Sequence, residues 1–218
     1  MSLLQSFYHL YSKYHSVLIR SIPQSSDKFL LLDRDGVIIH DVHHIVDSTD
    51  VSLMTHIPEL MESAMDHGYT IAILTNQSFL ARGLASFQSY LDVTEKMCEL
   101  LTSKSLPHIV LSSFWHPSYS PPSIMSSWRK PNNGMFQYLI NHFGCNPRNS
   151  LMIGDKLTDL QPAAMSNIHN LYHINTSNHP DELKKVKCWT HDSMNNVTFL
   201  STLPESLPLL FRKSIKNG

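Results

Sequence analysis

The stretch Phe29-Leu30-Leu31-Leu32-Asp33-Arg34-Asp35-Gly36 decides the fold class of this chain. Four consecutive apolar residues predict a short strand buried on both faces, as in a parallel sheet. Charged residues, Asp33 to Asp35, follow directly after this strand, and the flexible Gly36 lets the chain turn. The carboxylates of Asp33 and Asp35 can therefore point into one cleft. Taken alone, the segment is equally compatible with a polar turn that has no function.

The same pattern, an apolar run followed by a polar cluster, recurs along the chain. Residues 69–74 precede Thr75-Asn76-Gln77, and residues 150–153 precede Gly154-Asp155. Segments with helical spacing lie between such runs. They cover residues 57–67, 87–101 and 135–143, and further strands are expected at 109–111 and 171–174. This alternation predicts an α/β fold with a doubly wound, Rossmann-like parallel sheet, whose carboxyl edge collects the polar clusters.

The N-terminal region is expected to stand apart from this series. Apolar residues recur at helical intervals between residues 1 and 20, and the polar connection that follows contains Pro23. We therefore expect an N-terminal amphipathic helix and linker over residues 1–27, and one α/β domain over residues 28–218. The helix is expected to pack on the sheet as a strap; the alternative is a dimer or partner contact through Phe7, Leu10, Tyr14 and Val17.

Composition argues against several classes of function. The chain of 218 residues has 17 Lys and Arg against 18 Asp and Glu, so no overall field attracts nucleic acid or an anionic membrane. Its three cysteines are far apart, which is typical of neither a disulfide framework nor a Cys metal motif. No stretch is apolar over the length that a bilayer requires. We expect a cytoplasmic protein without nucleic-acid or membrane partners, either a monomer or a weak dimer.

Four polar motifs, taken in their order along the chain, resemble those of a known superfamily. The motifs are Asp33-Arg34-Asp35-Gly36-Val37, Thr75-Asn76-Gln77-Ser78, Arg129-Lys130-Pro131 and Gly154-Asp155-Lys156-Leu157-Thr158-Asp159. Over residues 28–176 this order resembles the haloacid dehalogenase (HAD) superfamily of phosphohydrolases. Ala81-Arg82-Gly83 and Asn133-Gly134-Met135 look closest to its capless branch of D-glycero-D-manno-heptose 1,7-bisphosphate phosphatases and histidinol-phosphate phosphatases. No segment between the motifs is long enough for a large cap domain.

The resemblance implies a catalytic role for each motif. Asp33 is expected to attack phosphorus and become an aspartyl-phosphate. Asp35 would protonate the leaving oxygen and then activate water. A Mg²⁺ ion would be held by Asp33, Asp155 and the backbone carbonyl of Asp35. Lys130 would neutralise the bound phosphate from the opposite side.

Further residues are expected to bind the substrate. The resemblance implies that Thr75, Asn76 and Gln77 contact it, and Arg82 and Arg129 could hold a second anionic group. Asp159 has two interpretations of equal weight: it orients Lys130 or a metal-bound water, or it is simply a favourable acid in the first turn of a helix.

The chain departs from this branch at the position of its zinc-binding loop. Where the family carries Cys and His ligands, this chain reads Ser113, Trp115, Ser126 and Trp128, none of them a credible zinc ligand. We predict that the structural zinc is absent. Packing of the two tryptophans, with the stiffness of Pro121 and Pro122, is expected to hold residues 112–128 instead. A second departure is Phe79, which replaces a glycine usual in the family.

The sequence thus predicts a Mg²⁺-dependent phosphomonoester hydrolase. A sugar phosphate such as D-glycero-D-manno-heptose 1,7-bisphosphate is the first choice of substrate, and histidinol phosphate is the alternative. A terminal phosphate of a nucleic acid is the third choice of substrate, because the sequence shows no series of basic residues that would bind a nucleic-acid backbone. A non-catalytic phosphate-binding or scaffold protein with the same fold is the alternative from a different class.

Overall fold

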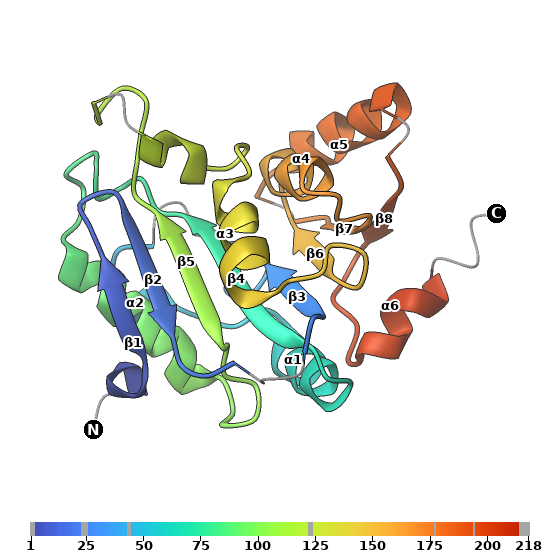
Figure 1. The fold of residues 1–218 in the computed structure, drawn as a ribbon, viewed down its shortest axis with the longest axis horizontal. Coiled ribbons are helices and arrows are strands. Elements are labelled where there is room, and N and C mark those ends of the chain that lie inside the picture. The colour runs from blue at the N-terminus through green and yellow to red at the C-terminus, as the bar shows by residue number, and fades with distance from the viewer. Residues whose placement is uncertain are drawn as a thin grey trace.

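The strand expected after the N-terminal region lies in the middle of an eight-stranded sheet (Figure 1). The computed structural model describes residues 3–22, 26–42, 45–121, 124–176, 178–193 and 195–213. The strands are β1 (Tyr8–Tyr11), β2 (His15–Ile19), β3 (Phe29–Leu32), β4 (Thr70–Asn76), β5 (Ile109–Ser113), β6 (Leu151–Gly154), β7 (Asn170–Ile174) and β8 (Val197–Leu200). Their spatial order is β1-β2-β5-β4-β3-β6-β7-β8.

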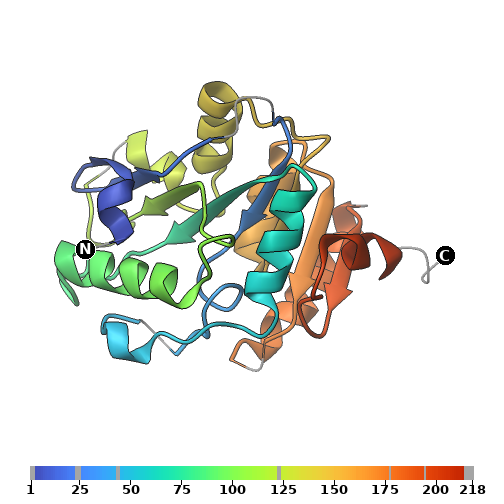
Figure 2. The same cartoon turned by 90° about the horizontal axis from the view of Figure 1, so that it is seen from below.

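From β5 to β8 in this order, neighbouring strands pair in parallel. The helices are α1 (Ile57–Asp66), α2 (Phe87–Leu100), α3 (Gly134–Phe143), α4 (Leu157–Met165), α5 (Pro180–Ser193) and α6 (Leu207–Lys213). Short 3₁₀ turns are η1 (Leu3–Ser6), η2 (Ser48–Asp50) and η3 (Ile124–Trp128). Helices cover both faces of the sheet, with α2 and α3 on opposite sides (Figure 2). The predicted doubly wound α/β fold is confirmed.

The central strand β3 divides its side chains between two hydrophobic clusters. Leu30 and Leu32 pack with residues of α1 and α2, whereas Phe29 and Leu31 pack with residues of α3 and α4. All four are fully buried. Successive side chains of a strand point to opposite faces, so an uninterrupted apolar run is what a strand covered on both faces requires.

The prediction of an N-terminal helix over residues 1–20 is wrong. Residues 8–19 form an antiparallel hairpin of β1 and β2, and β2 pairs antiparallel with β5, so this segment extends the sheet. Val17 and Leu18 enter different core clusters, as neighbours in a strand do. The pairing partner at Ile109–Ser113 decides the conformation, and it overrides the apolar spacing that looked helical. Pro23, in the expected linker, lies outside the described residues.

No helix in the described ranges combines the length and apolarity that a membrane crossing demands.

His108 makes the stability of the fold sensitive to acid. Its ring is buried, and its Nδ1 accepts a hydrogen bond from the backbone N–H of Ile71 at 3.0 Å. Burial, with the positive charge of Arg20 nearby, lowers the pKa of His108 from 6.5 to about 4. Because the folded pKa is the lower one, this stability is complete above the unfolded pKa and is lost as the pH falls from 6.5 towards 4. The loss amounts to at most about 3 kcal/mol.

We therefore expect His108→Asn, which keeps an acceptor near the position of Nδ1 but does not titrate, to flatten this decline. The free energy of unfolding, measured by urea denaturation from neutral pH down to about pH 4, tests this. Equal slopes for the wild type and the variant would assign the acid sensitivity to other groups.

Candidate active site

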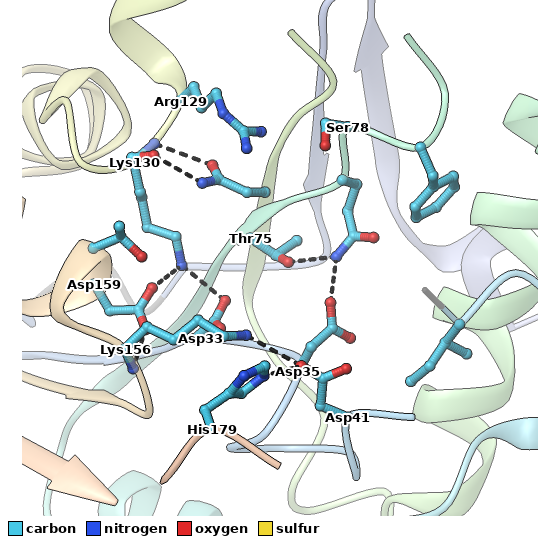
Figure 3. A pocket seen from close by; sticks show the side chains of 15 residues that line it. Asp33, Asp35, Asp41, Thr75, Ser78, Arg129, Lys130, Lys156, Asp159 and His179 are labelled. Carbon is cyan, nitrogen blue, oxygen red and sulfur yellow. Dashed lines mark hydrogen bonds and ion pairs between the residues drawn. The ribbon is translucent and has the colours of Figure 1, made fainter. Parts of the chain in front are cut away.

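A cavity of about 350 Å³ lies at the carboxyl ends of β3 and β4 (Figure 3). It is lined by Asp33, Asp35, Asp41, Ile45, Thr75, Asn76, Gln77, Ser78, Phe79, Arg129, Lys130, Lys156, Thr158, Asp159 and His179. Most residues that the sequence singles out are therefore brought together. Arg82 and Asp155 are not among the lining residues.

Lys130 joins the two acidic sides of this cavity. Its Nζ lies 2.8 Å from Asp33 Oδ1 and 2.6 Å from Asp159 Oδ1, and it also donates to the carbonyl oxygen of Leu74 at 2.6 Å. Figure 3 shows the ammonium between the two carboxylates. Burial disfavours the charged form, but Asp159 and Asp33 outweigh this effect and raise the pKa of Lys130. The residue is thus a fixed positive charge beside Asp33.

Asp155 is a buried carboxylate whose ion-pair partner, Lys156 Nζ, lies 3.7 Å from its Oδ2, beyond hydrogen-bond distance. It is 1 % exposed, and neither of its oxygens has a hydrogen-bond partner among the described residues. Burial, together with the charge of Asp159, raises the pKa of Asp155 to about 9. Carboxylate oxygens of Asp33, Asp155 and Asp159 lie within 4.8 Å of one another. A buried anion without hydrogen-bond donors is costly, and oxygen donors suit hard cations. Asp33 and Asp155 therefore fit a divalent ion such as Mg²⁺, whereas both oxygens of Asp159 are already engaged by Lys130 and by the backbone N–H of Lys156.

Gly36 permits the close approach of Asp155. It adopts a φ of +86°, and a Cβ at this residue would lie under 3.0 Å from the Asp155 carboxylate. Gly68 has a similar φ of +79°, but a Cβ there would meet nothing within 4 Å. Substituting each glycine in turn therefore distinguishes the effect of backbone strain, present at both residues, from the clash with the Asp155 carboxylate, present only at Gly36.

We expect Gly36→Ala to displace Asp155 and to weaken Mg²⁺ binding by about tenfold or more, which corresponds to about 1.4 kcal/mol. Gly68→Ala carries only the strain of a left-handed residue, about 1–2 kcal/mol of stability, and should leave Mg²⁺ affinity unchanged. Isothermal titration calorimetry of both variants with MgCl₂ measures this difference. Equal Mg²⁺ affinities in the two variants would mean that Asp155 does not contribute to ion binding.

The carboxylate of Asp35 faces the cavity and is held by two neighbours. Arg34 donates to it from Nε at 2.9 Å and from a terminal nitrogen at 3.2 Å, and Gln77 donates from Nε2 at 2.7 Å. The Gln77 amide also donates to Thr75 Oγ1 at 2.6 Å. Gln77, expected to bind substrate, thus lines the cavity and at the same time orients Asp35.

Asn76, like Gln77, both lines the cavity and positions a neighbouring site residue. Its side chain donates to the backbone carbonyl of Lys130 at 2.9 Å and accepts from the Lys130 backbone N–H at 3.0 Å. This reciprocal pair ties the end of β4 to the segment that carries the lysine. Asn76 therefore positions Lys130 and also lines the cavity.

Both interpretations of Asp159 hold. Its Oδ1 contacts Lys130, and its Oδ2 accepts the backbone N–H of Lys156 at 3.0 Å, at the start of α4. One carboxylate thus caps a helix and orients the lysine.

The two arginines expected to hold a second anion are placed differently. Arg129 lines the cavity and donates to the carbonyl oxygen of Trp115 at 3.3 Å. Arg82 is not a lining residue, but its charge acts on His116 nearby. The pKa of His116 is lowered mainly by burial and further by the positive charges of Arg129 and Arg82. Arg129 is therefore in the cavity, whereas Arg82 is not among its lining residues.

Asp41 and His179 line the cavity although the sequence did not single them out. Asp41 Oδ2 lies 3.1 Å from Lys156 Nζ and 2.8 Å from His179 Nε2. The two residues follow β3 and β7 and are far apart in sequence. No spacing rule connects them, because the two loops meet only in the folded chain.

The two tryptophans hold the segment of residues 112–128 unequally. Trp128 is 8 % exposed, and its ring centroid lies 4.8 Å from that of His15 and 5.0 Å from that of Tyr138. Trp115 is only partly buried, and its indole N–H donates to the carbonyl oxygen of Pro121 at 3.0 Å. Aromatic packing thus applies to Trp128, whereas Trp115 contributes a hydrogen bond. Pro122 lies outside the described residues.

We expect Trp128→Ala to lower the free energy of unfolding by about 3 kcal/mol, because it removes a large buried ring. Trp115→Ala, in the same segment, should cost less than about 1 kcal/mol. Chemical denaturation of the two variants tests this ranking. Similar losses would show that packing of Trp128 is not what holds the segment.

Most of this chain is similar to known phosphatases. Residues 28–177 match the family model described as polynucleotide kinase 3 phosphatase. The D-glycero-beta-D-manno-heptose-1,7-bisphosphate 7-phosphatase of Haemophilus ducreyi is 31 % identical over 146 residues, which cover 65 % of this chain and 79 % of the relative. The D-glycero-alpha-D-manno-heptose-1,7-bisphosphate 7-phosphatase of Campylobacter jejuni is 31 % identical over 149 residues, which cover 68 % and 83 %.

Solved structures show the same fold. A HAD-like phosphatase of Mesorhizobium loti superposes with a TM-score of 0.67 at 26 % identity, covering 77 % of this chain and 82 % of its own. The D,D-heptose 1,7-bisphosphate phosphatase of B. bronchiseptica, solved with magnesium and phosphate, gives a TM-score of 0.71 at 21 % identity, with coverage of 85 % and 99 %. This chain therefore belongs to the polynucleotide kinase 3 phosphatase family of the HAD superfamily and is a phosphatase of the heptose-bisphosphatase type.

Proposed function

We propose that this phosphatase is Mg²⁺-dependent and acts on a sugar phosphate, with D-glycero-D-manno-heptose 1,7-bisphosphate as its preferred substrate. The observation that carries the proposal is the position of three side chains. Asp33 and Lys130 line one cavity. A carboxylate oxygen of the buried Asp155, which has no hydrogen-bond donor among the described residues, lies within 4.8 Å of one of Asp33. The names of the relatives supply the substrate, since two of them at 31 % identity are heptose-bisphosphate phosphatases.

Asp33 is the proposed nucleophile. Its carboxylate attacks phosphorus, the Asp33–phosphorus bond forms, and the bond from phosphorus to the leaving sugar oxygen breaks. Lys130 Nζ, 2.8 Å from Asp33 Oδ1, offsets negative charge where the phosphoryl group transfers. The side chains of Asp33 and Asp155, with the Asp35 backbone carbonyl, would hold Mg²⁺. When bound, the ion supplies the positive charge that lets an anionic carboxylate approach an anionic phosphate.

Asp35 is the proposed proton carrier. It gives a proton to the leaving sugar oxygen in the first step and takes one from the attacking water in the second, so that the aspartyl-phosphate is hydrolysed and Asp33 is regenerated. Arg34 and Gln77 fix its orientation through three hydrogen bonds. The residues that would contact the transferred phosphoryl group are Thr75, Asn76 and Lys130.

The second phosphate of a bisphosphate substrate is assigned to Arg129, which lines the cavity, with Arg82 beyond it. We also retain the prediction that this chain carries no structural zinc, because Ser113, Trp115, Ser126 and Trp128 offer no zinc ligands. Elemental analysis of the purified protein tests the second point. Stoichiometric zinc would contradict it.

A substrate panel tests the proposed function. Phosphate release is measured from heptose 1,7-bisphosphate, histidinol phosphate, an aryl phosphate and an oligonucleotide with a 3′-phosphate, each with Mg²⁺ and with a chelator. We expect the highest kcat/KM for the heptose bisphosphate and loss of activity with the chelator. A preference for histidinol phosphate or for the oligonucleotide would replace the proposed substrate. Binding of inorganic phosphate without turnover of any substrate would favour the scaffold alternative.

A further inference from the structure

The side of the cavity away from Arg129 is formed by Asp41 and His179 (Figure 3). The proposed mechanism uses neither residue. Their side chains are 12 % and 23 % exposed, so both are largely enclosed and still reach the cavity. They lie next to Asp35, which faces the leaving group, and away from the Arg129 side. In the proposed mechanism the leaving group departs beside Asp35, so the organic part of the substrate would lie next to Asp41 and His179.

The two side chains are held in place from several directions. Asp41 Oδ2 lies 2.8 Å from His179 Nε2 and 3.1 Å from Lys156 Nζ. The amide of Asn178 donates to the backbone carbonyl of Asp41. The loops after β3 and β7 are thereby joined at this point. A site held in this way loses little conformational freedom when a ligand binds.

The chemistry of this side selects the kind of group that it accepts. A carboxylate offers about four acceptor sites, and an imidazole can donate or accept. Hydroxyl groups match both, since a hydroxyl both donates and accepts. A second phosphate matches less well, because the carboxylate of Asp41 accepts hydrogen bonds and cannot donate one to a phosphate oxygen. An alkyl or aryl group does not match, because it can form no hydrogen bond with a carboxylate or an imidazole.

We propose that Asp41 and His179 form a hydroxyl-binding subsite that selects phosphate esters of polyhydroxylated carbon chains. This inference rests on the proposed function and deepens it, since it states which residues recognise the sugar rather than its phosphates. Asp41 and His179 thus determine specificity, whereas Lys156 is a positioning residue that fixes the carboxylate of Asp41.

Two substrates that differ only in their hydroxyls test the subsite. A hexitol 6-phosphate and n-hexyl phosphate share a primary phosphate ester on a chain of six carbons. For wild type, kcat/KM should favour the hexitol ester. In Asp41→Asn and in His179→Leu we expect this preference to fall by about tenfold or more, the effect of losing one hydrogen bond to a charged group. Asp50→Asn is the matched control, because Asp50 is exposed on η2 in the same connection and does not line the cavity.

The outcomes separate this inference from the proposed function. A wild type without the preference, or variants that keep it, would overturn the subsite. If the preference depends on Asp41 and His179 while heptose bisphosphate is not hydrolysed, the subsite stands and the proposed substrate falls. If heptose bisphosphate is hydrolysed and the preference is equal in wild type and variants, the substrate stands and the subsite falls.

Discussion

Asp33→Asn is expected to lower kcat by at least about 10⁴-fold while leaving the chain folded, because an amide cannot act as the nucleophile. The substitution changes charge but hardly changes shape. Lys130 retains its contact with Asp159 at 2.6 Å and its bond to the carbonyl of Leu74, so its ammonium is not stranded. The loss of activity should therefore come without a loss of fold.

This prediction is checked by steady-state phosphate release from the aryl phosphate, with circular dichroism and thermal unfolding as readouts of folding. Asp66→Asn is the matched control, since Asp66 is an exposed acid at the end of α1. It should be fully active. More than about 1 % of wild-type kcat in the Asp33 variant would remove this residue from the nucleophile role.

Lys130→Met is expected to abolish activity and also to destabilise the Mg²⁺-free protein by about 3–5 kcal/mol. The replacement keeps the length of the side chain but removes the charge that Asp33 and Asp159 share. Two buried carboxylates are then left facing each other without a cation. Removing one partner from a buried ion cluster is costly for this reason, whatever the net contribution of the intact cluster.

Chemical denaturation in the presence of a chelator measures this loss. Lys156→Met is the comparison, because its ammonium is partly exposed and lies 3.1 Å from Asp41 and 3.7 Å from Asp155; we expect it to cost about 1 kcal/mol. The double variant Lys130→Met with Asp33→Asn should recover part of the stability, since one of the two stranded charges is gone. Additive losses in the double variant would show that Lys130 and Asp33 are not coupled.

The centre of the fold and of the site could be predicted from sequence because both depend on local signals. The apolar run at Phe29–Leu32 is too short for a typical helix and favours a strand covered on both faces. It is followed directly by Asp33 and, two residues later, by Asp35. The parallel topology then brings Thr75 and Asp155 to the same edge, because strand ends coincide in a parallel sheet.

The remaining parts depend on contacts between distant segments. The N-terminal hairpin is stabilised because β2 pairs with β5. The spacing of apolar residues within residues 1–20 gives no information about this distant pairing partner. Helix α5 is strongly polar and buries only Val186, so its pattern gave little signal. Asp41 and His179 meet across two loops, which no periodicity reveals.

The most direct test of the central claim is to locate covalently bound phosphate in enzyme quenched with acid during turnover with Mg²⁺. Mass spectrometry of the digested protein should find phosphate on the peptide that contains Asp33, and the Asp33→Asn variant should carry none. Phosphate attached to another residue, or turnover that persists in Asp33→Asn, would contradict the account.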